Sequence, residues 1–389
     1  MIKRQKSLVI VSYLTMFFLG FYLAMFQSLI LNFALYHDVN SAVMGTAVSA
    51  NYIGVSLAPL LVGMLASKAK KKSITLFSYF MLIIGTLSVF LSSNIWLQVI
   101  SFSIIGGGYG ITEATLSAIL VDEYPDKANL HMNLSQVLFS IGALSGPYIT
   151  KAIVGIISYQ FMYLGLSLIF AVMVVLFRFT KISADKQSDG WSDKGSIFRI
   201  ITSKTFILLL CAMFFYVGIE ELVGFFTDSY LYSVVNAPQY SALALSLFWG
   251  LMIPSRFLAG VLKNPVKVKI VFCSVLLAIS AIMLVLVDSI ALKLLLVAFI
   301  GFGCGPLWPL LMAVAGEKFK DHTGPVFNLL MSLGGFGGVA LPFIAGNIIV
   351  YSNETAAFYL AVVCVLVLLL CYLLISRNKP VQTDKIEQD

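Results

Sequence analysis

Twelve long runs of apolar residues decide which folds this chain can adopt. A helix that spans a bilayer needs about 20 apolar residues, and each run has roughly that length or more. Only 11% of the residues are charged, whereas soluble proteins carry roughly 25%. We therefore predict an all-α integral membrane protein with twelve transmembrane helices. The runs cover approximately residues 8–35, 41–66, 74–92, 96–120, 130–150, 160–178, 204–230, 239–262, 266–287, 292–315, 325–350 and 356–376.

The basic residues predict how these helices are oriented. If the N-terminus is cytoplasmic, nearly all of the 25 Lys and Arg residues fall in cytoplasmic segments, and Lys151 and Lys293 are the exceptions. This asymmetry follows the positive-inside rule. The basic residues lie between apolar runs instead of on one face, which argues against nucleic-acid binding. We predict a multi-pass protein of the cell membrane with both termini in the cytoplasm.

The chain is expected to consist of two six-helix halves. Residues 1–180 form the N-terminal half, 204–376 the C-terminal half and 377–389 a cytoplasmic tail, while the polar stretch 181–203 is a linker. A shift of 195 residues (106 to 301) aligns the halves in parallel. It pairs Gly106, Gly108, Gly110, Asp126, Asn133, Gly142 and Pro147 with Gly301, Gly303, Gly305, Asp321, Asn328, Gly337 and Pro342. Parallel halves are typical of the major facilitator fold, which binds its ligand between them near the midplane.

Several short motifs resemble the fucose permease-like branch of the major facilitator superfamily, that of the fucose:galactose:proton symporters. They are residues 106–113 (GGGYGITE), 142–147 (GALSGP), 216–220 (YVGIE), 305–309 (GPLWP) and the pair Arg256 and Gly260. The resemblance implies a secondary transporter for a sugar. The sequence departs from that branch at Gln27, where an aspartate can serve as a proton site, and at Ser117, where an asparagine is expected.

Three acidic residues lie closest to the middle of apolar runs: Glu113, Glu220 and Glu221. A charge there costs about 2.5 to 3.5 kcal/mol, so it survives mainly in a cavity or beside a partner. Adjacent helical residues lie about 100° apart, so Glu220 and Glu221 cannot face one cavity in the same way. We predict that Glu113 and Glu220 couple transport to protons and bind substrate. Packing of an acid among polar neighbours, and a cavity role for Glu221, remain as alternatives.

Further substrate-binding residues are predicted among amides and aromatic side chains. Amides donate and accept hydrogen bonds together, which suits a ligand rich in hydroxyl groups, and aromatic rings can stack on the apolar face of a sugar. The alternatives are interhelical hydrogen bonds for the amides and packing for the rings. The residues are Gln27, Tyr109, Asn133, Gln136, Tyr216, Trp249, Trp308 and Asn328.

These observations favour a secondary active transporter for a small polar solute, a sugar or glycoside, coupled to protons by alternating access. The alternative is a proton-coupled exporter of drugs or amphipathic metabolites, which the many aromatic residues would also suit. A phosphate-binding loop, a metal set and a nucleophile triad are not recognisable, so we expect no enzyme activity, cofactor or metal. The expected partners are the solute, protons and the lipid bilayer, and the expected state is a monomer.

The two halves are expected to move about a central site as near-rigid bodies, with glycines allowing close approach of helices during closure. These glycines are Gly142, Gly146, Gly335, Gly337 and Gly338. Leucine at position 337 should then impair transport without lowering expression.

Overall fold

The computed structural model describes residues 2–65, 70–124, 128–182, 199–319 and 323–377. The first half contains six long helices. They are α1 (Ile2–His37), α2 (Ser41–Leu65), α3 (Lys71–Leu91), α4 (Ile95–Glu123), α5 (Ala128–Val154) and α6 (Gln160–Arg178). Most of the predicted linker 181–203, and the predicted tail from residue 378 on, lie outside the described residues.

The second half repeats this arrangement, with two of its spans divided. Its elements are α8 (Lys204–Ser233), the short 3-10 helix η2 (Pro238–Tyr240), α9 (Ser241–Val261), α10 (Val266–Leu286), α11 (Ile290–Cys304), α12 (Leu307–Lys318), α13 (Thr323–Gly334), α14 (Phe336–Val350) and α15 (Thr355–Ile375). Within the described residues, twelve helical segments are long and apolar enough to cross a membrane. The predicted all-α fold with twelve spans is therefore confirmed.

The two divided spans differ from the continuous helices that the apolar runs predicted. One breaks between α11 and α12 at Gly305 and Pro306, and the other between α13 and α14 at Gly335. Proline has no backbone N–H and its ring clashes with the preceding turn, so it interrupts the hydrogen-bond ladder of a helix. At Gly335 the backbone stays in the ordinary helical region, and a Cβ there would collide with Ser56 Oγ of α2. Hydropathy does not record these local breaks.

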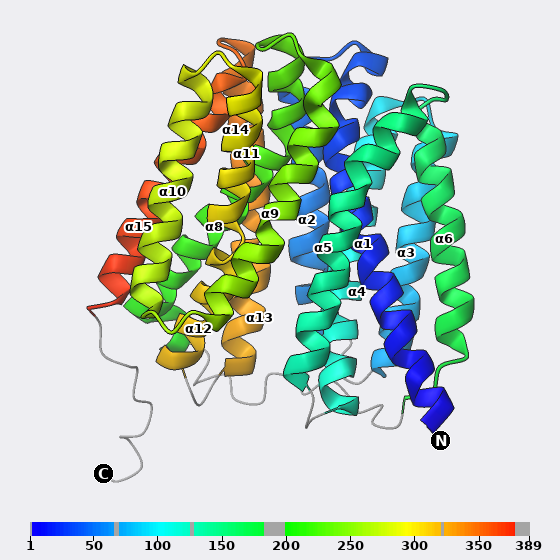
Figure 1. Ribbon diagram of the computed structural model, residues 1–389. Helices are drawn as coiled ribbons and strands as arrows, with labels where there is room; N and C mark the ends of the chain where they lie inside the picture. The colour runs from blue at the N-terminus through cyan, green and yellow to red at the C-terminus, as the bar shows by residue number, and fades with distance from the viewer. Residues whose placement is uncertain (1, 66–69, 125–127, 183–198, 320–322, 378–389) are drawn as a thin grey trace.

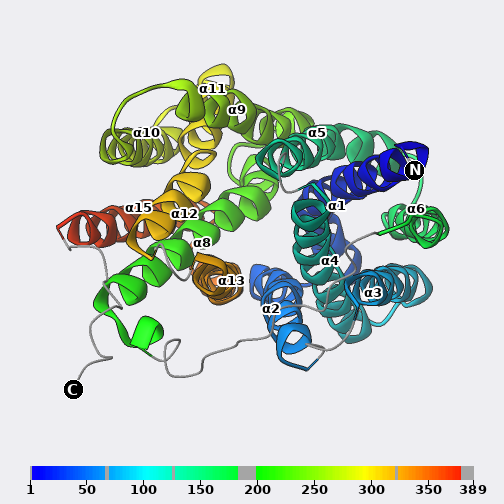
Figure 2. The ribbon, with the colours of Figure 1, turned by 90° about the horizontal axis from the view of Figure 1, so that it is seen from below.

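The two halves stand side by side as helical bundles (Figure 1). Within the first half, α1 packs on α5, and α4 packs on α2 and α3; within the second, α8 packs on α14 and α15, and α11 on α9 and α10. The halves meet mainly through α2 with α14 and α5 with α9. Smaller contacts join α1 with α8, α13 with α2 and α1 with α9. We call the face where α1 begins and α15 ends the lower face, which Figure 2 shows from below, and the opposite one the upper face.

Most of the predicted close-approach glycines pack helices within one half. A Cβ at Gly142 would collide with the backbone of Phe17 on α1, and one at Gly337 with the carbonyl of Phe214 on α8. Gly338 instead faces the ring of Tyr52 across the two halves. The packing thus separates glycines that build a half from glycines at the surface between halves, a distinction that the repeat alone did not provide.

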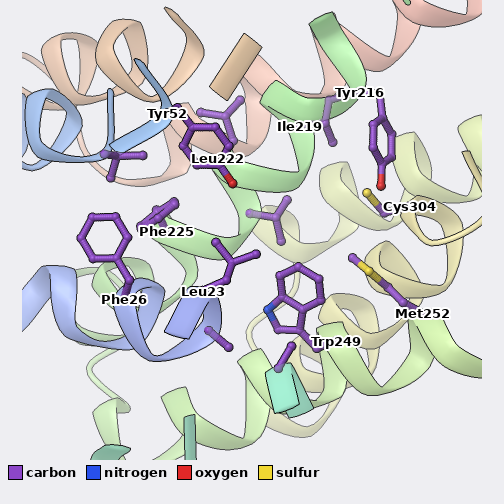
Figure 3. Close-up of a cluster of buried hydrophobic side chains, with 14 of the residues drawn as sticks. Leu23, Phe26, Tyr52, Tyr216, Ile219, Leu222, Phe225, Trp249, Met252 and Cys304 are labelled. Atoms are coloured by element: carbon purple, nitrogen blue, oxygen red, sulfur yellow. The ribbon is translucent and has the colours of Figure 1, made fainter. Parts of the chain in front are cut away.

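An apolar cluster lies where the halves meet above their centre. Figure 3 shows Leu23 and Phe26 of α1 together with Phe225 of α8. The rings of Phe26 and Phe225 meet edge to face with their centroids 5.1 Å apart. Such aromatic pairs are stabilising beyond the area that they bury. These rings are fully buried, so the junction between the halves is closely packed at this level.

Candidate functional site

A cavity of about 620 Å³ lies between the halves. Its walls come from α1, α2, α4 and α5 on one side and from α8, α9, α10, α12 and α13 on the other. Residues near the lower ends of α9 and α10, Gly260 and Val266, belong to its lining, so the cavity extends toward the lower face. Its polar and aromatic lining includes Tyr52, Tyr109, Glu113, Gln136, Tyr216, Glu220, Glu221, Trp249, Arg256, Lys269, Trp308 and Ser332.

The wall from the first half carries Glu113 on α4. Tyr109 lies one turn earlier on the same helix, and Gln136 comes from α5; both place hydrogen-bonding groups beside the carboxylate. Gly110 faces the backbone of α2, where a Cβ would crowd Val55. The glycine therefore brings α4 against α2 and leaves Glu113 on the cavity side. With Tyr52 of α2, this wall offers one carboxylate, one amide and two phenols to a ligand.

The wall from the second half carries Glu220 on α8. The hydroxyl of Tyr216, one turn earlier, donates to Glu220 Oε1 at 3.0 Å. Arg256 Nη2 on α9 lies 4.0 Å from the same oxygen. The cavity thus holds a carboxylate with a cation at ion-pair distance, and both side chains are partly exposed to it.

Arg256 also satisfies a backbone carbonyl that Pro309 leaves free. The carbonyl of Gly305 would normally accept from the N–H of residue 309, but Pro309 has none. Arg256 Nε donates to that carbonyl at 2.9 Å. The guanidinium also reaches across to the first half, where Nη1 donates to Ser140 Oγ at 3.4 Å. One side chain therefore connects the α11–α12 break with both walls.

Glu221 lies at the upper end of the cavity and bonds across the two halves. Gln27 Nε2 on α1 donates to Glu221 Oε2 at 3.3 Å, and the indole Nε1 of Trp249 donates to Gln27 Oε1 at 2.9 Å. Tyr52 on α2 places its hydroxyl beside Glu221. Glu221 is only 1% exposed and Gln27 is fully buried. Gln27 does not belong to the cavity lining and acts as a bridge.

The structure brings most of the predicted site residues into one cavity. Tyr109, Glu113, Gln136, Tyr216, Glu220, Trp249 and Trp308 all line it. The side chains of Asn133 and Asn328 lie outside the described part of the structure, so their predicted roles remain predictions.

Five polar cavity residues were not among the predicted site residues: Tyr52, Glu221, Arg256, Lys269 and Ser332. Arg256 was assigned to the cytoplasmic basic residues because it is close to the end of an apolar run, yet it lines the cavity. Glu221 was the less favoured of two neighbouring acids, yet both line the cavity. The sequence did contain one signal for the arginine, because Arg256 and Gly260 together form one of the motifs that resemble the family.

Above the cavity, an ion pair joins the halves. Lys151 Nζ near the upper end of α5 lies 2.5 Å from Asp228 Oδ2 near the upper end of α8. Asp228 is 1% exposed, and its Oδ1 has no hydrogen-bond partner in the structure. This ion pair and the apolar cluster close the upper side, while the cavity extends toward the lower one.

Two repeated six-helix bundles around a central polar cavity are the architecture of a secondary transporter. The sequence model of the Major Facilitator Superfamily matches residues 9–300 and 265–389. The chain therefore belongs to the major facilitator superfamily, and its family is one of transporters, not enzymes.

Similar proteins carry sugar-transporter names. The chain is 26% identical over 310 residues to the glucose/mannose transporter GlcP of Bacillus subtilis, covering 75% of each protein. It is 27% identical over 194 residues to a putative glucose/galactose transporter of Helicobacter pylori, covering 49% of this chain and 47% of that protein. A crystal structure of a mutant of the nucleoside transporter NupG superposes with a TM-score of 0.78 at 14% identity, covering 95% and 98% of the two chains. The last similarity supports the fold.

Proposed function

We propose that the protein moves a sugar or another small polar solute across the cell membrane by alternating access, with protons as the coupling ion. The central observation is the cavity between the halves, which combines three carboxylates with an amide, a cation and aromatic rings. Such a lining can bond hydroxyl groups and stack on the apolar face of a sugar ring. The names of the two bacterial relatives support the same class of solute.

The orientation and assembly belong to the same proposal. Both termini are cytoplasmic, so the lower face is the cytoplasmic one and the cavity opens inward. The positive-inside distribution supports this orientation. The protein works as a monomer, because the walls of the cavity come from the two halves of a single chain.

Counterflow into proteoliposomes tests the sugar assignment. We expect preloaded D-glucose, D-mannose or D-galactose to drive accumulation of its labelled form, and deoxygenated analogues to compete at least about tenfold more weakly. Buried polar groups that recognise hydroxyls are left unpaired by a ligand without them. Equal competition by deoxy sugars, or stronger competition by amphipathic cations, would support the exporter instead.

Proton coupling is tested by glutamine at each predicted coupling residue. A proton bound to a cavity carboxylate neutralises a charge that is costly within the membrane, and Glu113→Gln mimics that neutral form. We expect Glu113→Gln and Glu220→Gln to abolish uptake driven by a pH gradient while counterflow continues. Paired measurements in one proteoliposome preparation separate the two activities.

The control for this experiment is Gln136→Glu, which adds a carboxylate to the cavity without removing either glutamate. If the two glutamates carry the proton, this variant should still accumulate solute in response to a pH gradient, unlike the two glutamine variants. Full accumulation in both glutamine variants would contradict proton coupling through these residues. Uniport or another coupling ion would then describe the transporter better.

A further inference from the structure

Glu220 and Glu221 are neighbours in sequence and share one cavity, but their partners lie in different halves. Glu220 meets Tyr216 and Arg256, which both belong to the second half. Glu221 meets Gln27, which belongs to the first half. Glu113 has its hydrogen-bonding neighbours Tyr109 and Gln136 within the first half. Among the three cavity glutamates of the described residues, Glu221 is thus the one that bonds across the halves.

The face of α8 around Glu221 is shaped for contact with the first half. Glu221, Gly224 and Asp228 are separated by three and four residues, so they lie on one face of the helix. A Cβ at Gly224 would collide with the side-chain amide of Gln27. Asp228 forms the ion pair with Lys151 of α5. This face therefore meets the first half through a hydrogen bond, a close approach and an ion pair.

Gln27 has the chemistry that the bridge requires. The indole N–H of Trp249 can only donate and the carboxylate of ionised Glu221 can only accept, so a side chain between them needs both an acceptor and a donor. A neutral amide meets that need, with Oε1 facing Trp249 at 2.9 Å and Nε2 facing Glu221 at 3.3 Å. Both outer members belong to the second half, whereas Gln27 belongs to the first. The amide is therefore held between two helices of the opposite half.

We propose that Glu221 is a positioning residue that holds the upper side of the transporter closed through Gln27 and also lines the cavity. This inference rests on the proposed function, because it requires a transporter that alternates between a state closed on the upper side and a state open there. Glu221 stabilises the closed one. Opening the upper side moves α1 away from α8 and breaks the bond between Glu221 and Gln27. A cavity ligand that bonds Glu221 competes with Gln27, so occupation of the cavity favours release of the upper side.

The test measures how often the upper side opens, without any sugar. Ser246 on α9 is 3% exposed and its Oγ donates to the carbonyl of Leu144 in the first half at 2.9 Å. A cysteine introduced by Ser246→Cys is shielded while the halves stay together. Its rate of reaction with a charged maleimide in lipid nanodiscs reports the population that is open on this side. The same protein without Ser246→Cys gives the background from native cysteines.

Glu221→Met removes the hydrogen bond between Gln27 and Glu221 from the second half, and Gln27→Met removes it from the first. Both variants are compared in protein that also carries Ser246→Cys. We expect each to raise the labelling rate about tenfold, which corresponds to about 1.4 kcal/mol. The double variant should label no faster than the faster single variant, since both changes remove one interaction. Glu221→Gln should remain near the original rate, because its amide oxygen can still accept from Gln27.

Glu220→Met is the matched control, since it removes the same group from the neighbouring position. Its labelling rate should stay close to the original one because its direct partners, Tyr216 and Arg256, lie within its own half. The Gly305 carbonyl also holds Arg256, so its hydrogen bond to Ser140 of the first half does not depend on Glu220. Equal rates for Glu220→Met and Glu221→Met, or an unchanged rate in both Glu221→Met and Gln27→Met, would overturn the proposal. Gel filtration of each variant verifies its folding. Because the nanodisc measurement uses no sugar or pH gradient, failure of the solute assignment would leave its result standing.

Discussion

We expect leucine at position 337 to remove most of the folded protein from the membrane, in contrast to the unchanged expression that the sequence alone suggested. A Cβ at Gly337 would already collide with the carbonyl of Phe214, and leucine adds three further carbons. Overpacking of a core costs about 1–3 kcal/mol, and more where backbone must move. The amount of monodisperse protein after detergent extraction and its melting temperature measure the effect.

Gly338→Leu is the comparison for this prediction. Gly338 faces the side chain of Tyr52 in the first half, and a ring can move where a backbone carbonyl cannot. We expect this variant to fold and to transport poorly, because leucine would separate α14 from α2. If Gly337→Leu matched the original protein in yield and melting temperature, the packing of α14 on α8 would not be as close as described.

Replacement of Arg256 by methionine should reduce counterflow about 100-fold while the protein still folds. Methionine leaves the Gly305 carbonyl without its donor and Glu220 without the cation at 4.0 Å. Leaving a buried hydrogen-bond acceptor such as the Gly305 carbonyl unpaired costs about 1–3 kcal/mol. Initial counterflow rates, divided by the amount of reconstituted protein, give the comparison.

Arg256→Lys serves as the control because it keeps the charge and loses the planar fork of donors. Lysine can approach Glu220 or the Gly305 carbonyl, but it lacks the geometry to serve both. We expect its rate to fall between those of the original protein and Arg256→Met. A methionine variant with the original rate would mean that Arg256 has no role in the cavity during transport.

The sequence predicted the membrane architecture well because its physical causes are local or periodic. Apolar runs of spanning length, a repeat that pairs Pro147 with Pro342, and carboxylates within apolar runs can all be seen along the chain. The cavity lining of Glu113 and Glu220 follows from the same reasoning, since a buried charge needs a cavity or a partner. Their proposed roles in proton coupling remain predictions.

The remaining features depend on contacts between distant positions. Gln27 and Glu221 are 194 residues apart and meet only because α1 packs on α8. The partner of Arg256 is a carbonyl freed by Pro309, so neither the charge of the arginine nor local hydropathy reveals it. The direction in which Gly337 and Gly338 face likewise follows from how α14 is wedged between α8 and α2.

In the proposed alternating-access cycle, the apolar cluster between the halves would make the populations of the two states depend on temperature. Opening the upper side would expose rings such as Phe26 and Phe225 to water, and exposure of apolar surface raises the heat capacity. The enthalpy difference between the two states therefore changes with temperature. Since hydrophobic association weakens on cooling, cooling lowers the contribution of this cluster to the closed upper side. The polar contacts then contribute a larger share of the free energy that stabilises the closed upper side. These contacts are Lys151 with Asp228 and Gln27 with Glu221.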